Sequence, residues 1–382
     1  MIITSIPRLE NIAAAKIAVE VCNKPDVKFL NKNLEEKLAY IFSLQSNNKQ
    51  WKELQTNISQ KISSLGLPKL LQKKVNGLIR PVLLEIEQWK EDHCEILCTH
   101  IDLQMQISWN PDGTINREKT AEALIQMENF DIRNRFVLAC FYFLEDDILT
   151  LWHKLSCCYE QTSIYDTNAS PIVRFWVNWL KGHEMDWACL ASECVLYPPP
   201  NLFPINALVF SRFLHLLPAS DKMHCLIFQI NRRRMNRSDL FSCLSKLNRN
   251  ERTKIFKECA KNILRHYINW PLQNHFLEMA ECLWPYLSET NFQHLLEFIL
   301  HRRILQEWSD FDYIGLLKDF WLSSPDHFKE FVKGKNVYKS LMVVINHDRT
   351  KPLPKERLRR KFLLCPLFLF NALGLSGTRG TI

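Results

Sequence analysis

Glycine is scarce in this sequence, with 9 in 382 residues, against an average of about 7% in proteins generally. Doubly wound sheets and α/β barrels need glycine at tight turns and wherever the backbone approaches a phosphate group. The scarcity therefore argues against those folds. Hydrophobic residues make up 47% of the chain, which is enough to bury a substantial core and argues against a disordered protein. The balance favours an all-α chain.

Short catalytic motifs are also lacking. None of the patterns GxxxxGK[ST], GxGxxG, HExxH or GxSxG occurs in the sequence, although each would indicate a well-understood enzyme site. The run EDD at residues 145–147 could suggest paired catalytic carboxylates, but acids that complement the dipole at the start of a helix explain it more simply. We therefore expect a non-enzymatic protein with no catalytic residues, no cofactor and no small-molecule substrate.

Positive charge is concentrated at the C-terminus. Of the formal net charge of +8, residues 351–382 contribute +6 through seven basic residues and one acid, which leaves +2 for the rest. A nucleic-acid groove needs many clustered cations, and only the run RRRMNR at residues 232–237 offers some elsewhere. We interpret that run as a solvated helix end, so a nucleic-acid partner is not expected.

The thirteen cysteines do not suggest a disulfide framework. Their number is odd, they are spread from Cys22 to Cys365, and the first twenty residues lack the pattern of a secretory signal. We expect reduced thiols that pack as small hydrophobic side chains in a cytoplasmic or nuclear protein.

One cluster of metal-ligand residue types stands out in the stretch DHCEILCTH. It holds His93, Cys94, Cys98 and His100, and the two cysteines are one helical turn apart. Structural zinc sites usually draw their ligands from two separated pairs. Packing in the core or at the surface is therefore the main interpretation, with a zinc site as the alternative.

The N-terminal third shows helical periodicity in four segments. Apolar spacing predicts helices over residues 7–22, 34–44, 51–65 and 78–101, the last with Pro81 tolerated near its start. The stretch WNPDGTI at residues 109–115 then indicates a Pro-Asp-Gly turn. We place a boundary there, which predicts a helical region at 1–108, a hairpin array at 109–345 and a tail at 346–382.

A motif recurs within the predicted array. Leu217, Leu247 and Leu287 each precede a polar break, and each is followed after eight and nine residues by a pair of largely apolar residues. Looser copies lie at Leu144, Leu180 and Leu322. The six leucines are 30 to 40 residues apart, the length of a helical-hairpin repeat.

This spacing predicts stacked helical hairpins, because one hairpin alone cannot bury its apolar face. Asn248, Ser288 and Ser323 lie at the breaks and can cap the helices that follow. A regular α-solenoid and a more irregular all-helical stack both fit the pattern, and the three hinge leucines are structural residues in either.

Tryptophan is abundant, with 11 in the chain. We expect most to pack between helices, while any that faces a groove would be a candidate anchor for a partner.

The tail combines a basic cluster with an apolar run. Residues 355–361 are largely basic, and residues 362–375 are largely apolar but too few to span a bilayer and are interrupted by Pro366. The tail could cap the array, dock a partner, or bind a membrane surface through residues 355–375.

Two resemblances add to this interpretation. The run ISWNPDGTINREKTAEALIQMENFDIRNRFVLACFYFLEDDILTLW (residues 107–152) and the opening IPRLENIAAAKIAVEVCN resemble a family of uncharacterised helical-repeat proteins in arthropods, which implies no reaction. The segment KPLPKERL at residues 351–358 is similar to part of a SOCS box, the C-terminal element of certain ubiquitin-ligase adaptors. Residues 340–350 lack the Leu-Cys-Arg type of elongin-binding helix found there.

The sequence thus predicts a protein–protein interaction scaffold of helical hairpins with an unidentified protein partner. The alternatives are a substrate-recruiting adaptor of a ubiquitin ligase and a membrane-peripheral protein anchored by its tail.

Overall fold

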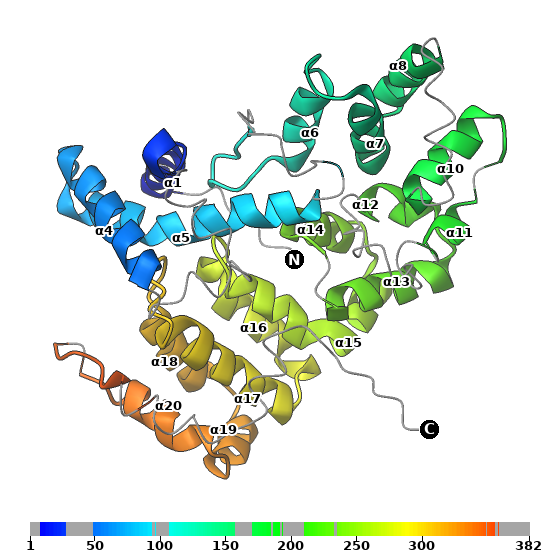
Figure 1. The fold of residues 1–382 in the computed structure, drawn as a ribbon. Helices are drawn as coiled ribbons and strands as arrows, with labels where there is room; N and C mark the ends of the chain where they lie inside the picture. The colour runs from blue at the N-terminus through cyan, green and yellow to red at the C-terminus, as the bar shows by residue number, and fades with distance from the viewer. Residues whose placement is uncertain are drawn as a thin grey trace, which may run out of the picture. The chain divides into compact units, whose positions relative to one another are not determined.

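The computed structural model is all-α (Figure 1). It describes residues 8–27, 49–93, 96, 107–156, 170–184, 186–191, 193, 210–232, 235–348, 350–355 and 358. Over these residues every named element is a helix, and the extended pairing consists of one bridge between Trp109 and Ile115. No helix in the described ranges is long and apolar enough to cross a membrane.

Contacts divide the chain into two compact units, Met1–Tyr286 and Leu287–Ile382. This division does not coincide with the predicted boundary at residue 109, because the WNPDGTI turn packs inside the first unit. The predicted helix at 34–44 and the apolar run at 362–375 lie outside the described residues.

The first unit begins with three helices around one apolar core: α1 (Leu9–Cys22), α4 (Lys49–Ser64) and α5 (Lys69–Asp92). For the helix predicted over residues 78–101, which corresponds to α5, the predicted start at Leu78 is wrong. Helix α5 begins nine residues earlier and continues through Pro81, since apolar residues on both sides of the proline are buried against its neighbours. Their burial outweighs the roughly 3 kcal/mol that an internal proline costs.

Short helices follow in sequence: α6 (Arg117–Ile125), α7 (Ile132–Tyr142), α8 (Glu145–Ser156), α10 (Pro171–Leu180) and α11 (Trp187–Ala191). Neighbours in sequence pack on one another, as α6 does on α7 and α7 on α8. Asn116 and Asp131 cap α6 and α7 by accepting backbone hydrogen bonds. The EDD run forms the first turn of α8, in agreement with the helix-dipole interpretation.

The middle of the chain shows the hairpin stacking most clearly. It comprises α12 (Phe210–Phe213), η2 (Leu214–Leu216), α13 (Ala219–Arg232), α14 (Arg237–Ser245) and α15 (Arg249–Tyr267). The first helices of two successive hairpins, α12 and α14, pack together, and so do the second helices, α13 and α15. This alternation is the pattern expected of stacked hairpins.

Two side-chain pairs define the relative direction and the register of α13 and α15. Lys222 and Glu251, near the two N-terminal ends, form an ion pair. Asn262 donates to Asn231 Oδ1 at 2.9 Å near the other ends. The two helices therefore run parallel and in register, as equivalent helices of neighbouring repeats do. Helices η3 (Gln273–His275), α16 (Phe276–Leu283) and η4 (Trp284–Tyr286) then pack on α15 and complete the first unit.

The second unit repeats the alternation. Its elements are α17 (Glu289–Phe298), the π-helical segment η5 (Ile299–Ile304), α18 (Tyr313–Ser323), α19 (Asp326–Lys333) and α20 (Val337–Ile345). Helix α17 packs on α19, and α18 packs on α20. Phe292 lies at the centre, with its ring centroid 5.1 Å from that of Phe320 and 5.0 Å from that of Phe328. The prediction of an all-α chain of stacked hairpins is confirmed.

The three hinge leucines are all buried. Leu217, Leu247 and Leu287 are 6%, 4% and 8% exposed, and each lies just before the start of a helix, α13, α15 and α17 respectively. The prediction that Leu322 is a looser copy of the hinge leucine is wrong, because its side chain is 68% exposed. Phe320 and Trp321 occupy the core positions at this break and turn Leu322 outward.

Two of the three predicted caps are confirmed. Asn248 and Glu251 form a reciprocal capping box at the start of α15, and Ser288 accepts from the backbone N–H of Asn291 at the start of α17. Ser323 does not cap. It is the last residue of α18, since Pro325 delays the next helix to Asp326.

Truncating a hinge leucine should destabilise the protein. We expect Leu287→Ala to lower the free energy of unfolding by about 2–5 kcal/mol, because it leaves a cavity at a buried site. Leu322→Ala is the matched control and should cost less than about 0.5 kcal/mol. Urea denaturation measures both, and equal effects would show that hinge burial is not what distinguishes the two leucines.

Candidate functional site

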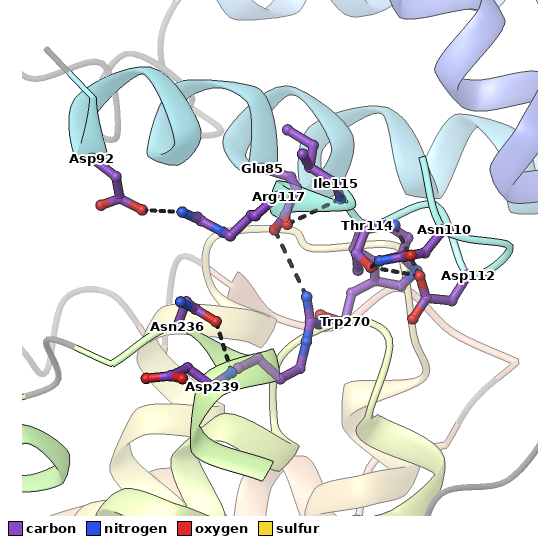
Figure 2. A network of polar contacts seen from close by, with 11 residues as sticks. Glu85, Asp92, Asn110, Asp112, Thr114, Ile115, Arg117, Asn236, Asp239 and Trp270 are labelled. Carbon is purple, nitrogen blue, oxygen red and sulfur yellow. Dashed lines mark hydrogen bonds and ion pairs between the residues drawn. The ribbon is translucent and has the colours of Figure 1, made fainter. Parts of the chain in front are cut away.

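A polar cluster in the first unit joins segments that are far apart in sequence (Figure 2). It ties α5 to the WNPDGTI turn and its flanking residues (108–116), to α6, to α14 and to the loop after α15. We call it the polar junction. Its residues are Glu85, Asp92, Asn110, Asp112, Thr114, Ile115, Arg117, Asn236, Arg237, Asp239 and Trp270.

Its most buried ion pair links α5 to α6. Arg117 Nη1 lies 2.6 Å from Asp92 Oδ2, and the two side chains are only 11% and 3% exposed. Gln88 donates to the other oxygen of Asp92 at 2.9 Å. Because Asp92 ends α5 and Arg117 begins α6, this pair fixes the ends of both helices.

Glu85 is the branching point of the junction. Its Oε1 accepts from the backbone N–H of Ile115 at 3.3 Å, and its Oε2 lies 3.8 Å from Arg237 Nη2 on α14. Arg237 in turn donates to the backbone carbonyl of Trp270. The Glu85 carboxylate thus connects α5 with Ile115 at the end of the WNPDGTI turn, 30 residues away, and with Arg237 on α14, about 150 residues away.

The WNPDGTI turn is held by its own side chains. Asp112 Oδ1 accepts from the backbone N–H of Thr114 at 3.0 Å and from its hydroxyl at 2.6 Å. Asn110 donates to the same hydroxyl oxygen at 3.0 Å.

Gly113 has φ +84°, and a Cβ built there would lie 2.9 Å from the Cβ of Ala15 and 3.0 Å from the ring of Trp270. Only glycine fits both the backbone conformation and the space. The turn is therefore a packing element and not a linker.

His93 lies in a buried aromatic stack beside the junction. Its ring centroid is 4.1 Å from that of Trp89 and 5.8 Å from that of Tyr142. Nδ1 is 2.6 Å from the Trp89 carbonyl oxygen, to which it donates, so Nε2 accepts from the Tyr142 hydroxyl at 2.9 Å. Burial lowers the pKa of His93 to about 3 and raises that of Tyr142. Both side chains are therefore neutral at physiological pH.

This arrangement bears on the zinc alternative. Both ring nitrogens of His93 are engaged with protein partners in this structure. The other three candidate ligands, Cys94, Cys98 and His100, lie outside the described residues. Among the residues that are described, no three His, Cys, Asp or Glu side chains are grouped to hold a metal ion. The cysteines of those ranges are free thiols, and most are buried as expected.

Asp239 anchors α14 to α12. Its Oδ1 accepts from the backbone N–H of Ser211 at 2.9 Å, and Lys246 donates to the Ser211 carbonyl at 2.6 Å. Asp239 is 4% exposed, and this burial raises its pKa from 3.8 to about 6, although hydrogen bonds from Ser211 and the charge of Lys246 oppose the shift.

The polar groups of the junction bond mainly to one another and to backbone groups. The arrangement can hold several helices in one geometry, and its ion pairs are among buried or half-buried side chains. Sequence reasoning missed Glu85, Arg117 and Arg237. It treated the last as part of a solvated helix end, an interpretation that fits Arg232, exposed at the end of α13, but not Arg237, which begins α14 and belongs to the junction.

Comparisons with protein-family models, with curated proteins and with solved structures find no match for this chain. The resemblances to arthropod helical proteins and to the SOCS box stay predictions.

Breaking the buried ion pair should destabilise the first unit. We expect Asp92→Asn to lower the free energy of unfolding by about 3–5 kcal/mol, because it leaves the charge of Arg117 uncompensated. Glu193→Gln is the matched control, since Glu193 pairs with Arg174 at 2.8 Å while both side chains are 41–45% exposed. It should cost less than about 1 kcal/mol. Similar losses in the two variants would contradict the assigned burial.

The raised pKa of Asp239 predicts a pH-dependent stability. Between pH 4 and pH 6 the native state binds this proton more tightly than the unfolded state, so stability falls as pH rises and stays lower above both pKa values. Asp239→Asn removes this contribution while keeping an oxygen that can accept from Ser211. Denaturation of both proteins at several pH values should show the variant gaining on the order of 2–3 kcal/mol relative to wild type from pH 4 to pH 7. A difference that does not change with pH would refute the shift.

Proposed function

We propose that this protein is a non-enzymatic protein–protein interaction scaffold of the cytoplasm or nucleus. The parallel, in-register packing of α13 and α15 carries the proposal. Equivalent helices of stacked hairpins present a continuous outward surface whose residues are not needed for the core, and such surfaces serve as binding faces in helical-repeat proteins.

The polar junction supports this role. A binding face keeps its shape only if the helices that form it cannot shift. The chain from Glu85 through Arg237 to Trp270 joins the start of α14 to α5 and to the loop after α15. It thereby restrains both ends of the segment that contains α14 and α15.

The outward side of α15 indicates the chemistry of the partner. Lys254, Lys257, Lys261 and Arg265 recur at intervals of three or four residues, which places them on one face of the helix. Lys254 and Lys257 are exposed, and Glu258 is the one acid of the helix after Glu251. The face is therefore positively charged, and an acidic segment of a protein partner fits it by electrostatic complementarity.

Charge reversal on this face tests the proposal. The full chain and its Lys254→Glu/Lys257→Glu variant are used as baits in affinity purification from cells, followed by mass spectrometry. We expect the wild type to recover a defined set of proteins with acidic segments and the variant to recover at least about tenfold less, since like charges then oppose each other.

Lys119→Glu/Lys154→Glu is the matched control, because it reverses two other exposed lysines of the same unit. It should recover the same proteins as wild type. Equal recovery by all three baits, or nothing above background, would contradict the proposal. Recovery of elongin or cullin components would favour the ubiquitin-ligase adaptor instead.

A further inference from the structure

The turn between α4 and α5 exposes leucine side chains to solvent. Leu65, just after α4, is 44% exposed, and Leu70, in the first turn of α5, is 65% exposed. Leu9, the first residue of α1, is 81% exposed. Exposed apolar side chains that gather in one place mark an interaction site more often than single ones do. We call these three residues the leucine tip.

The local geometry brings the three leucines to one region. Gly66 has φ +65° and allows a tight turn, so Leu65 and Leu70 lie at the same end of the α4–α5 hairpin. Lys74, one helical turn after Leu70, forms a 2.7 Å ion pair with Glu10. Glu10 at the start of α1 therefore lies near the second turn of α5, and Leu9 is its neighbour in sequence.

Cations surround the leucine tip. Lys73, three residues after Leu70, is exposed on the same side of α5, Lys69 is exposed at the start of that helix, and Arg8 is exposed next to Leu9. The acids of this region, Glu10 and Asp26, are ion-paired with Lys74 and Lys61. The uncompensated charge around the leucines is therefore positive.

We propose that the leucine tip binds the surface of an anionic lipid bilayer. Leucines that project from a turn and from helix ends can enter the boundary between headgroups and acyl chains, while the flanking lysines face the lipid phosphates. An exposed apolar group with a basic surround is complementary to this surface in both polarity and charge. The proposal is independent of the C-terminal tail and of the α15 face.

Serine substitutions should leave the fold intact, because the neighbours of the tip hold the packing. Leu67 and Leu71 are half-buried against the core of α1, α4 and α5, whereas the three tip residues are mostly in solvent. The variants can therefore be studied as full-length folded chains, with far-ultraviolet circular dichroism as the check.

Vesicle sedimentation tests the proposal with the full chain. We expect binding to vesicles of phosphatidylcholine with about 30% phosphatidylserine, and much weaker binding to phosphatidylcholine alone, since basic residues near an anionic surface are attracted to it. Leu9→Ser/Leu65→Ser/Leu70→Ser should lower the partition coefficient at least about tenfold. Lys69→Glu/Lys73→Glu should weaken binding to the anionic vesicles selectively.

Exposed leucines elsewhere provide the matched control. Leu149, Leu216 and Leu322 are 39%, 43% and 68% exposed, and replacing all three with serine should not change the binding. A chain that ends at Pro354 should also bind as wild type. The proposal is overturned if the tip variant binds like wild type, if wild type binds neither kind of vesicle, or if only loss of the tail abolishes binding. It is also overturned if the wild-type chain does not bind vesicles and the tip variant fails to recover a protein that the wild type recovers in affinity purification.

Discussion

The contact between α13 and α15 is the interaction on which the helical stack of the first unit depends. Each helix belongs to a hairpin too short to enclose its own apolar side chains, so Ile230 on one and Ile255 on the other are fully buried only when neighbouring hairpins stack. Because Lys222 with Glu251 and Asn231 with Asn262 pair near opposite ends, the register of this contact is fixed. The outward face of α15 follows from that register.

Polar contacts set the position of the N-terminal helices relative to this stack within the first unit. Apolar packing is tolerant of small shifts, whereas the bonds from Glu85 to Ile115 and Arg237 have defined directions. Gly113 adds a steric requirement, since the turn fits between α1 and the Trp270 loop only without a side chain. The hydrophobic core and the polar junction thus contribute differently, the first to stability and the second to geometry.

The sequence was informative wherever structure depends on local spacing. Hinge leucines followed by a capping residue and an apolar pair identified the stacked hairpins, because capping and helical periodicity act over a few residues. The same logic failed at Leu322, where Pro325 delayed the next helix and aromatic residues took the core positions. It also failed at Pro81, because tertiary packing there outweighs the local cost of proline.

The polar junction could not be predicted in the same way. The contacts that join its separate helices link residues 25 to about 150 positions apart, and no local pattern marks Glu85 or Arg117 as special. The Pro-Asp-Gly turn was recognised as a turn, but its close contact with Ala15 and Trp270 exists only in the folded chain. The charge of the α15 face, in contrast, follows directly from helical spacing once the helix is known.

The register of α13 against α15 is the central claim, and a cysteine cross-link measures it most directly. Asn231→Cys combined with Asn262→Cys places two thiols where the side chains now share a hydrogen bond. Asn231→Cys with Lys254→Cys places them about two turns out of register. After mild oxidation, peptide mapping should find the 231–262 cross-link in high yield and little of the 231–254 cross-link. The opposite preference, or no cross-link in either protein, would contradict the stacked arrangement and the binding face built on it.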